Sequence, residues 1–164
     1  MMKHSRRRRS GYTYAEGVRE DFWTEFATFA APLGKRMHLP EPRPWFFYRI
    51  PVGRTGFELS LTIRVRGPAR CELYISHQKA KRAFRRLRLK EAVIKRRLGS
   101  LKWEFLPGRH ACRIAEYYLV DINQRKNWPG LLRRFRTRAQ AFHSVFTPLV
   151  ANLDLPSRKD RGAR

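Results

Sequence analysis

Residues 57–66, FELSLTIRVR, alternate apolar and polar side chains over their whole length. A period of two is typical of a strand that buries one face and leaves the other in water. A Gly-Pro-Ala turn at 67–69 separates this run from a second alternating run at 70–77. The sequence therefore predicts an antiparallel hairpin, and with it a sheet that has one apolar and one polar face.

The length of the loop decides which side chains of this hairpin meet. A short turn pairs Arg66 with Arg70, and this register places Arg64 opposite Glu72 on the polar face. We expect those two side chains to form a cross-strand ion pair.

Start and stop residues predict three helices. A capping box begins the first, a Ser cap and a Gly stop bound the second at 79–98, and an Asn-Trp-Pro start opens the third. These signals are carried by Thr13, Glu16 and Pro32, by Ser76 and Gly99, and by Asn127 and Pro129. Further strands are predicted at 45–50, 102–107 and 112–121. The order is α-β-β-β-α-β-β-α, an α+β domain with a mainly antiparallel sheet covered by helices.

Basic segments lie at both ends of the chain. Residues 1–12 contain four consecutive arginines, and residues 156–164 are again rich in Lys and Arg. Neither segment can bury apolar area. We therefore expect a disordered basic arm over 1–12, a single folded domain over 13–155 and a basic tail over 156–164.

Positive charge is concentrated in the second predicted helix. Residues 79–99 hold ten Lys or Arg and one acid, Glu91. The apolar residues share one narrow arc, with Glu91 among them, so the bases occupy a broad outer face. The whole chain carries a net charge of +24, far beyond the roughly 2–8 that solubility requires. This excess predicts a polyanionic partner, and nucleic acid is the commonest one for a basic domain.

Membrane and secretion signals are lacking in the sequence. No run reaches the roughly 18 apolar residues of a membrane span, and no apolar segment follows the basic N-terminus. Two cysteines, Cys71 and Cys112, are too few for a disulfide framework. We expect a cytoplasmic protein without a membrane partner.

Several spaced motifs resemble one bacterial family, domain of unknown function 4268. They are EDFW (20–23), Trp45, GRTGFELSLTI (53–63), CELYI (71–75), FRRL (84–87), IKRRLGSLKWEFLPG (94–108), RIAEY (113–117) and AFHSVFTPLVANL (141–153). The resemblance implies an α+β domain, often the C-terminal part of longer proteins whose N-terminal part is nuclease-like, and it implies no assigned catalytic residue. The chain differs from such relatives in its basic charge, for example at Lys95, where they usually carry Glu.

A divalent-metal nuclease, complete or decayed, is the enzymatic alternative. Restriction-endonuclease-like cores need an acid and then Asp/Glu-x-Lys on the next strand, where carboxylates hold Mg²⁺ and the lysine positions water. Glu58 and Glu72 are the candidates, and Tyr74 stands in the place of the lysine. In the predicted register the two acids lie about 20 Å apart along the strand. One metal could not touch both, so we predict no catalytic residue.

Zinc is the other metal to consider. Cys71, His77, His110 and Cys112 have suitable chemistry, but their spacing is not that of a finger or knuckle. We therefore predict no metal site and no cofactor.

The expected function is nucleic-acid binding without catalysis, as an accessory to a nuclease-related or other nucleoprotein complex. An adaptor for an acidic protein is the alternative, and the sequence leaves both DNA and RNA open. Aromatic candidates for stacking on unpaired bases are Tyr12, Tyr14, Tyr74 and Trp128. The residues expected to contact nucleic acid are Arg6, Arg7, Arg8, Arg9, Arg64, Arg66, Lys79, Arg82, Arg85, Arg86, Arg88, Lys95, Arg96, Arg97, Arg133 and Arg134.

Overall fold

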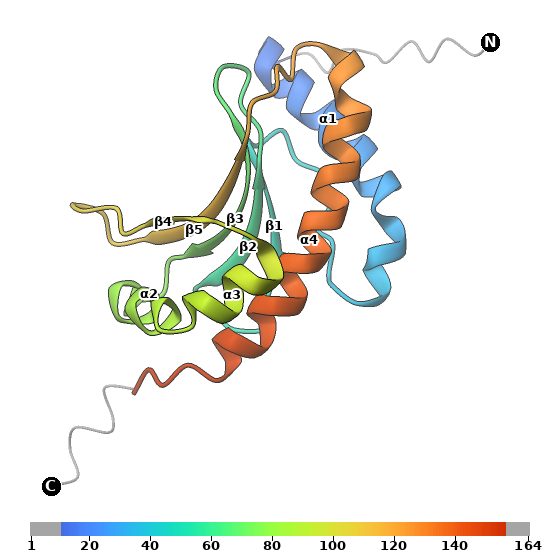
Figure 1. Cartoon of the computed structure of the whole chain (residues 1–164). Helices are drawn as coiled ribbons and strands as arrows, with labels where there is room; N and C mark the ends of the chain where they lie inside the picture. The colour runs from blue at the N-terminus through green and yellow to red at the C-terminus, as the bar shows by residue number, and fades with distance from the viewer. Residues whose placement is uncertain (1–10, 157–164) are drawn as a thin grey trace, which may run out of the picture.

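The computed structural model describes residues 11–156 and shows the predicted α+β architecture (Figure 1). Five antiparallel strands form one sheet in the order β1-β2-β3-β5-β4. The strands are β1 (Phe47–Pro51), β2 (Phe57–Thr62), β3 (Ala69–Ile75), β4 (Lys102–Glu104) and β5 (Cys112–Tyr118). The α-helices are α1 (Tyr14–Phe29), α2 (Ala80–Arg88), α3 (Glu91–Leu98) and α4 (Trp128–Ala151), with 3-10 turns η1 (Ala31–Lys35) and η2 (Arg125–Asn127).

The helices of residues 11–156 cover one face of the sheet. In Figure 1, α1 and α4 lie along that face, while α2 and α3 lie at its lower end. The core between the layers is aromatic: the rings of Trp23, Phe26 and Phe135 contact one another and Tyr48 of β1 contacts the first two. The capping box predicted at the start of α1 is confirmed, because Thr13 and Glu16 bond reciprocally.

No helix of residues 11–156 covers the other face, which we call the open face (Figure 1). Directly opposed residues of neighbouring strands point to the same side of a sheet, so the strand register identifies the side chains there. They are Phe47, Arg49, Glu58, Ser60, Thr62, Arg70, Glu72, Tyr74, Lys102, Glu104, Arg113, Ala115 and Tyr117.

The predicted hairpin is present, but its predicted register is wrong by four residues. Arg70 lies opposite Thr62, and Glu72 lies opposite Ser60, so Arg64 has left the strand. Strand β2 ends at Thr62 and a longer loop follows: the ladder with β1 continues by one bond, from Ile63 N–H to Phe46 O, and Asn123 Nδ2 donates to Val65 O in the loop. An even shift preserves the faces, so the polar side chains of both strands still share the open face.

The predicted helix at 79–98 is divided in two. A turn at Leu89 and Lys90 ends α2 and begins α3. The break lets α2 pack on β3 and β5 while α3 packs on α4. Gly99 ends α3 as predicted, with φ of 79°. Ser76 is not the cap, because α2 begins later, at Ala80.

Candidate functional site

The bases of α2 and α3 point outward from the sheet and α4. Phe84, Leu87 and Ile94 turn inward and are buried, as the narrow apolar stripe predicts. This arrangement leaves the long cationic side chains in water. The exposed bases, which together we call the basic surface, are Arg82, Arg85, Arg86, Arg88, Lys95, Arg96 and Arg97.

Few acidic groups neutralise the basic surface. Asp154 lies 3.9 Å from Arg82 and 3.7 Å from Arg86, and Glu91 lies 3.1 Å from Arg88. The Glu91 carboxylate is more exposed than its place in the apolar arc suggested. The other four bases of the surface form no ion pair with an acid of residues 11–156. Exposed pairs contribute only about 0–1 kcal/mol. Two acids do not neutralise seven bases, so the surface keeps most of its positive electrostatic potential.

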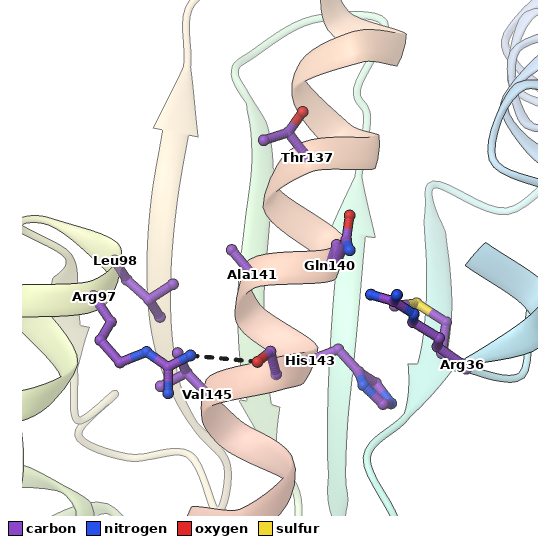
Figure 2. Close-up of a pocket in the computed structure, with 10 residues that line it drawn as sticks. Arg36, Arg97, Leu98, Thr137, Gln140, Ala141, His143 and Val145 are labelled. Atoms are coloured by element: carbon purple, nitrogen blue, oxygen red, sulfur yellow. Dashed lines mark hydrogen bonds between the residues drawn. The ribbon is translucent and has the colours of Figure 1, made fainter. Parts of the chain in front are cut away.

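An open groove of about 520 Å³ continues the basic surface onto α4. Figure 2 shows Arg97 of α3 and Arg36, which follows η1, on opposite sides of α4. Arg97 donates to Ser144 Oγ at 3.4 Å, which holds its guanidinium over the helix. None of the described lining residues is acidic. The groove therefore presents two cations to any anion that enters it.

Polar, uncharged side chains line part of the groove. Thr137, Gln140, His143 and Ser144 come from successive turns of α4 (Figure 2). Burial lowers the pKa of His143, so its imidazole is neutral at pH 7. Thr137, Gln140 and Ser144 can donate hydrogen bonds to phosphate oxygens, whereas the single N–H of neutral His143 bonds the backbone of Pro51. The groove could not be predicted from the sequence, because Arg36, Arg97 and α4 are far apart along the chain.

The remaining predicted bases lie elsewhere. Arg64 and Arg66 are in the β2–β3 loop, which contacts the loop before α4, and Arg133 and Arg134 are in the second turn of α4. At a rise of 1.5 Å per residue, Arg133 lies about 16 Å along α4 from Ser144. The predicted residues therefore form two groups at opposite ends of α4. Arg6, Arg7, Arg8 and Arg9 lie outside the described residues.

Two bases of the helices hold the fold together instead of facing a partner. Lys81 Nζ bonds the carbonyl of Phe105 and lies 3.0 and 3.1 Å from those of Leu106 and Ala111. Arg138 bonds Glu116 at 2.6 Å and the carbonyl of Leu98 at 2.6 Å. Lys79 is half-buried at the start of α2. These side chains add to the positive electrostatic potential of the domain, but the hydrogen bonds of Lys81 and Arg138 join parts of the fold to one another.

The candidate acids Glu58 and Glu72 lie on the open face. The corrected register places Glu72 opposite Ser60, two residues from Glu58, so the large predicted separation is wrong. Each carboxylate is held by arginine: Glu58 by Arg49 at 3.2 Å, and Glu72 by Arg70 at 2.9 Å and by Arg113 at 3.5 Å.

Burial raises the pKa of the Glu72 carboxyl, although both arginines oppose the shift. Tyr74 occupies the position that a nuclease lysine would need, and it lies opposite Glu58. Among residues 11–156, no group of three or more His, Cys, Asp or Glu side chains could hold a metal ion. What stands on the open face is a network of ion pairs.

Two of the candidates for base stacking, Trp128 and Tyr74, lie in different environments. Trp128 is 2% exposed and its Nε1 donates to Ile122 O, so it is a core residue. Tyr74 lies on the open face as an alternating strand requires. The sequence prediction missed Trp45, which is 54% exposed. A tryptophan just before a strand carries no period that would distinguish an exposed ring from a buried one.

A family model described as "Domain of unknown function (DUF4268)" matches residues 18–150. No curated protein and no solved structure matches the chain. Within residues 11–156, no helix has the length and apolar character needed to cross a membrane.

Proposed function

The chain belongs to the DUF4268 family, and from its surface we propose that it is a nucleic-acid-binding domain without catalytic activity. The basic surface of α2 and α3 contacts phosphates of the backbone. The observation that carries this proposal is the exposure of seven bases on two short helices, with only Asp154 and Glu91 as described acidic partners. Neighbouring like charges on a helix repel one another, and a row of phosphates relieves that repulsion.

The groove on α4 holds one arginine of this surface, Arg97, in a defined position through its hydrogen bond to Ser144. Phosphate contacts position a protein on a nucleic acid without reading its sequence. Arginine is well suited to such contacts, because its planar guanidinium can bond two oxygens at once. We infer that Arg36 and Arg97 contact backbone phosphates on either side of α4, and that the bases of α2 follow the chain of phosphates outward.

The biological setting is inferred from the resemblance described above. Relatives with a nuclease-like N-terminal part suggest that this domain delivers nucleic acid to a nuclease-related or other nucleoprotein complex. Both cysteines are free thiols in the core, which fits a reducing compartment such as the cytoplasm.

Equilibrium binding of the full chain to labelled oligonucleotides tests the proposal. We expect duplex DNA, single-stranded DNA and RNA to bind at low salt, with log K falling linearly against log salt by roughly 0.9 per neutralised phosphate for a duplex or 0.7 for a single strand. The adaptor alternative is tested in the same titration with polyglutamate as competitor. Absence of binding to all three nucleic acids, or displacement by polyglutamate but not by unlabelled oligonucleotide, would overturn the proposal.

A further inference from the structure

The aromatic side chains of β1 and its neighbours gather on the open face. Trp45 precedes β1 by two residues, and its ring lies 5.3 Å from that of Phe47. The guanidinium of Arg49 lies 4.2 Å from the Phe47 ring centroid and 5.4 Å from that of Tyr74. Aromatic rings and stacked guanidinium planes are thus presented together on a sheet that no described helix covers.

A buried ionic network lies beside these rings on the open face. Arg70 is 8% and Glu72 is 3% exposed, although no helix of residues 11–156 lies over them. Arg70 also lies under the ring of Tyr117, at 5.7 Å, and the Tyr117 hydroxyl donates to Glu104 at 2.5 Å. Buried, mutually bonded charges of this kind hold one geometry. The charged side chains of β3 and β5 are therefore held in place in the free protein, and the Tyr117 ring with them.

The open face is unsuited to binding phosphates. Within the sheet its arginines are paired: Arg49 with Glu58, and Arg70 and Arg113 with Glu72. Cationic charge that is already compensated adds little to backbone binding. Polar groups such as Glu104 and Lys102, which lie beside these pairs at the β4 edge, are instead able to bond the edges of bases.

We propose that the open face binds the unpaired bases of a single-stranded nucleic acid, which stack on Trp45, Phe47 and the Arg49 guanidinium. Bases of a duplex are already stacked and cannot reach a flat protein surface, whereas single-stranded bases stack on aromatic rings and arginine planes. This inference rests on the proposed function, and it specifies the strand state of the ligand.

Strand β4 joins the open face to the basic surface. Its Trp103 lies under the Arg88 guanidinium of α2, at 4.9 Å from the ring centroid. The neighbouring residues Lys102 and Glu104 point to the open face, since successive strand residues alternate sides. A single strand that passes this edge contacts phosphate-binding arginines on one side and stacking rings on the other.

Binding of the full chain to oligothymidine of about 12 nucleotides, compared with a duplex of equal length, tests the inference. The variants are W45A and the double variant W45A/F47L, and F29L is the matched control, because Phe29 is an aromatic residue that is 36% exposed at the end of α1. The hydrogen bond from Trp23 Nε1 to the backbone carbonyl at position 45 survives in W45A. Thermal unfolding of each variant confirms that it folds.

We expect W45A/F47L to bind the single strand about tenfold more weakly, with an unchanged salt slope and unchanged duplex binding, because stacking is independent of salt. F29L should bind as the unaltered chain does. Fluorescence of the exposed Trp45 should be quenched by the single strand but not by inorganic polyphosphate, which has no bases. Full single-strand affinity in W45A/F47L, or preference for the duplex, overturns the inference while the proposed function stands. Failure of the unaltered chain to bind any nucleic acid overturns the proposed function itself.

Discussion

Lys81 shows that a lysine inside a basic helix can serve the fold alone. Its ammonium group bonds three carbonyls of the segment between β4 and β5, at Phe105, Leu106 and Ala111. It also lies 4.3 Å from the Phe105 ring centroid. The group therefore ties the β4–β5 loop to α2, a role that no count of charges along the sequence can reveal.

Replacing Lys81 separates its structural role from binding. We expect K81M to lower the free energy of unfolding by about 2 kcal/mol, because it leaves three carbonyls without a charged donor, while nucleic-acid affinity of the folded variant changes little. Urea denaturation measures the first quantity. K95M is the matched control, since Lys95 is exposed on α3. It should leave the free energy of unfolding nearly unchanged and weaken nucleic-acid binding. A K81M variant as stable as K95M would contradict the account.

His77 predicts a pH dependence at the start of α2. Its Nδ1 accepts the N–H of Lys79 at 3.0 Å, which requires a neutral ring. Burial, together with nearby Arg54 and Lys79, lowers the pKa of His77 below its ordinary value of 6.5. The unfolded chain then binds the proton more readily, so stability is complete above pH 6.5 and falls as the pH drops through the lowered folded pKa.

The variant H77Q checks this sign, because glutamine does not titrate. We expect its unfolding free energy to depend less steeply on pH below 6.5 than that of the unaltered chain, while H38Q, at an exposed position, keeps the original slope. His143, whose pKa burial also lowers, accounts for part of the remaining slope. Parallel pH profiles for H77Q and the unaltered chain would show that His77 is uncoupled from folding.

At the level of elements, α4 depends on a cap supplied by a distant loop. Arg54, between β1 and β2, donates from Nη1 to the carbonyls of Val150 and Leu153, both at 2.8 Å. These carbonyls belong to the last turn of α4 and the residues after it, where helix bonds are missing and the dipole favours a cation.

Removing this cap should weaken the whole domain, because α4 covers the sheet. We expect R54M to lower the free energy of unfolding by about 1–2 kcal/mol. R109M, which alters an exposed arginine of the β4–β5 loop, should leave it within about 0.5 kcal/mol. Chemical denaturation of both variants measures the difference, and an equal stability for the two would rule out the cap.

The hairpin shows what the sequence could and could not predict at this scale. Alternation in β2 and β3 identified which side chains share the open face, because that depends only on the parity of the strand. The register follows from a loop at 63–68 that is longer than the predicted turn at 67–69. Val65 O in that loop accepts a bond from Asn123, 58 residues away, and no local pattern contains that contact. For the same reason the basic outer face of α2 and α3 was predictable from the apolar stripe, whereas the turn at Leu89 was not.

For the molecule as a whole, the corrected register changes the reason for expecting no nuclease activity. Glu58 and Glu72 are near enough to share a site, but Arg49, Arg70 and Arg113 already pair with them, and Tyr74 replaces the lysine. Metal binding would have to break those pairs. We therefore expect no cleavage of DNA or RNA with Mg²⁺ or Mn²⁺. Cleavage that disappears in E58Q or E72Q would contradict this expectation.

The distribution of charge over the molecule carries the central claim, that α2 and α3 form the phosphate-binding surface. The most direct measurement compares two threefold variants of the full chain that remove equal charge. One is R85Q/K95Q/R96Q on α2 and α3, and the other is R66Q/K126Q/R133Q near the opposite end of α4. All six side chains are exposed and form no ion pair with an acid of residues 11–156.

The quantity to measure is the slope of log K against log salt for an oligonucleotide bound to each variant. The account predicts that R85Q/K95Q/R96Q has a weaker affinity and a slope shallower by up to about 2.7 for duplex DNA, or about 2.1 for a single strand. The variant R66Q/K126Q/R133Q should keep nearly the original slope. Its three removed charges lie far from the bound phosphates, and salt screens their electrostatic effect over that distance. Equal changes in the two variants would show that net charge alone drives binding, and would contradict the assignment of the surface to α2 and α3.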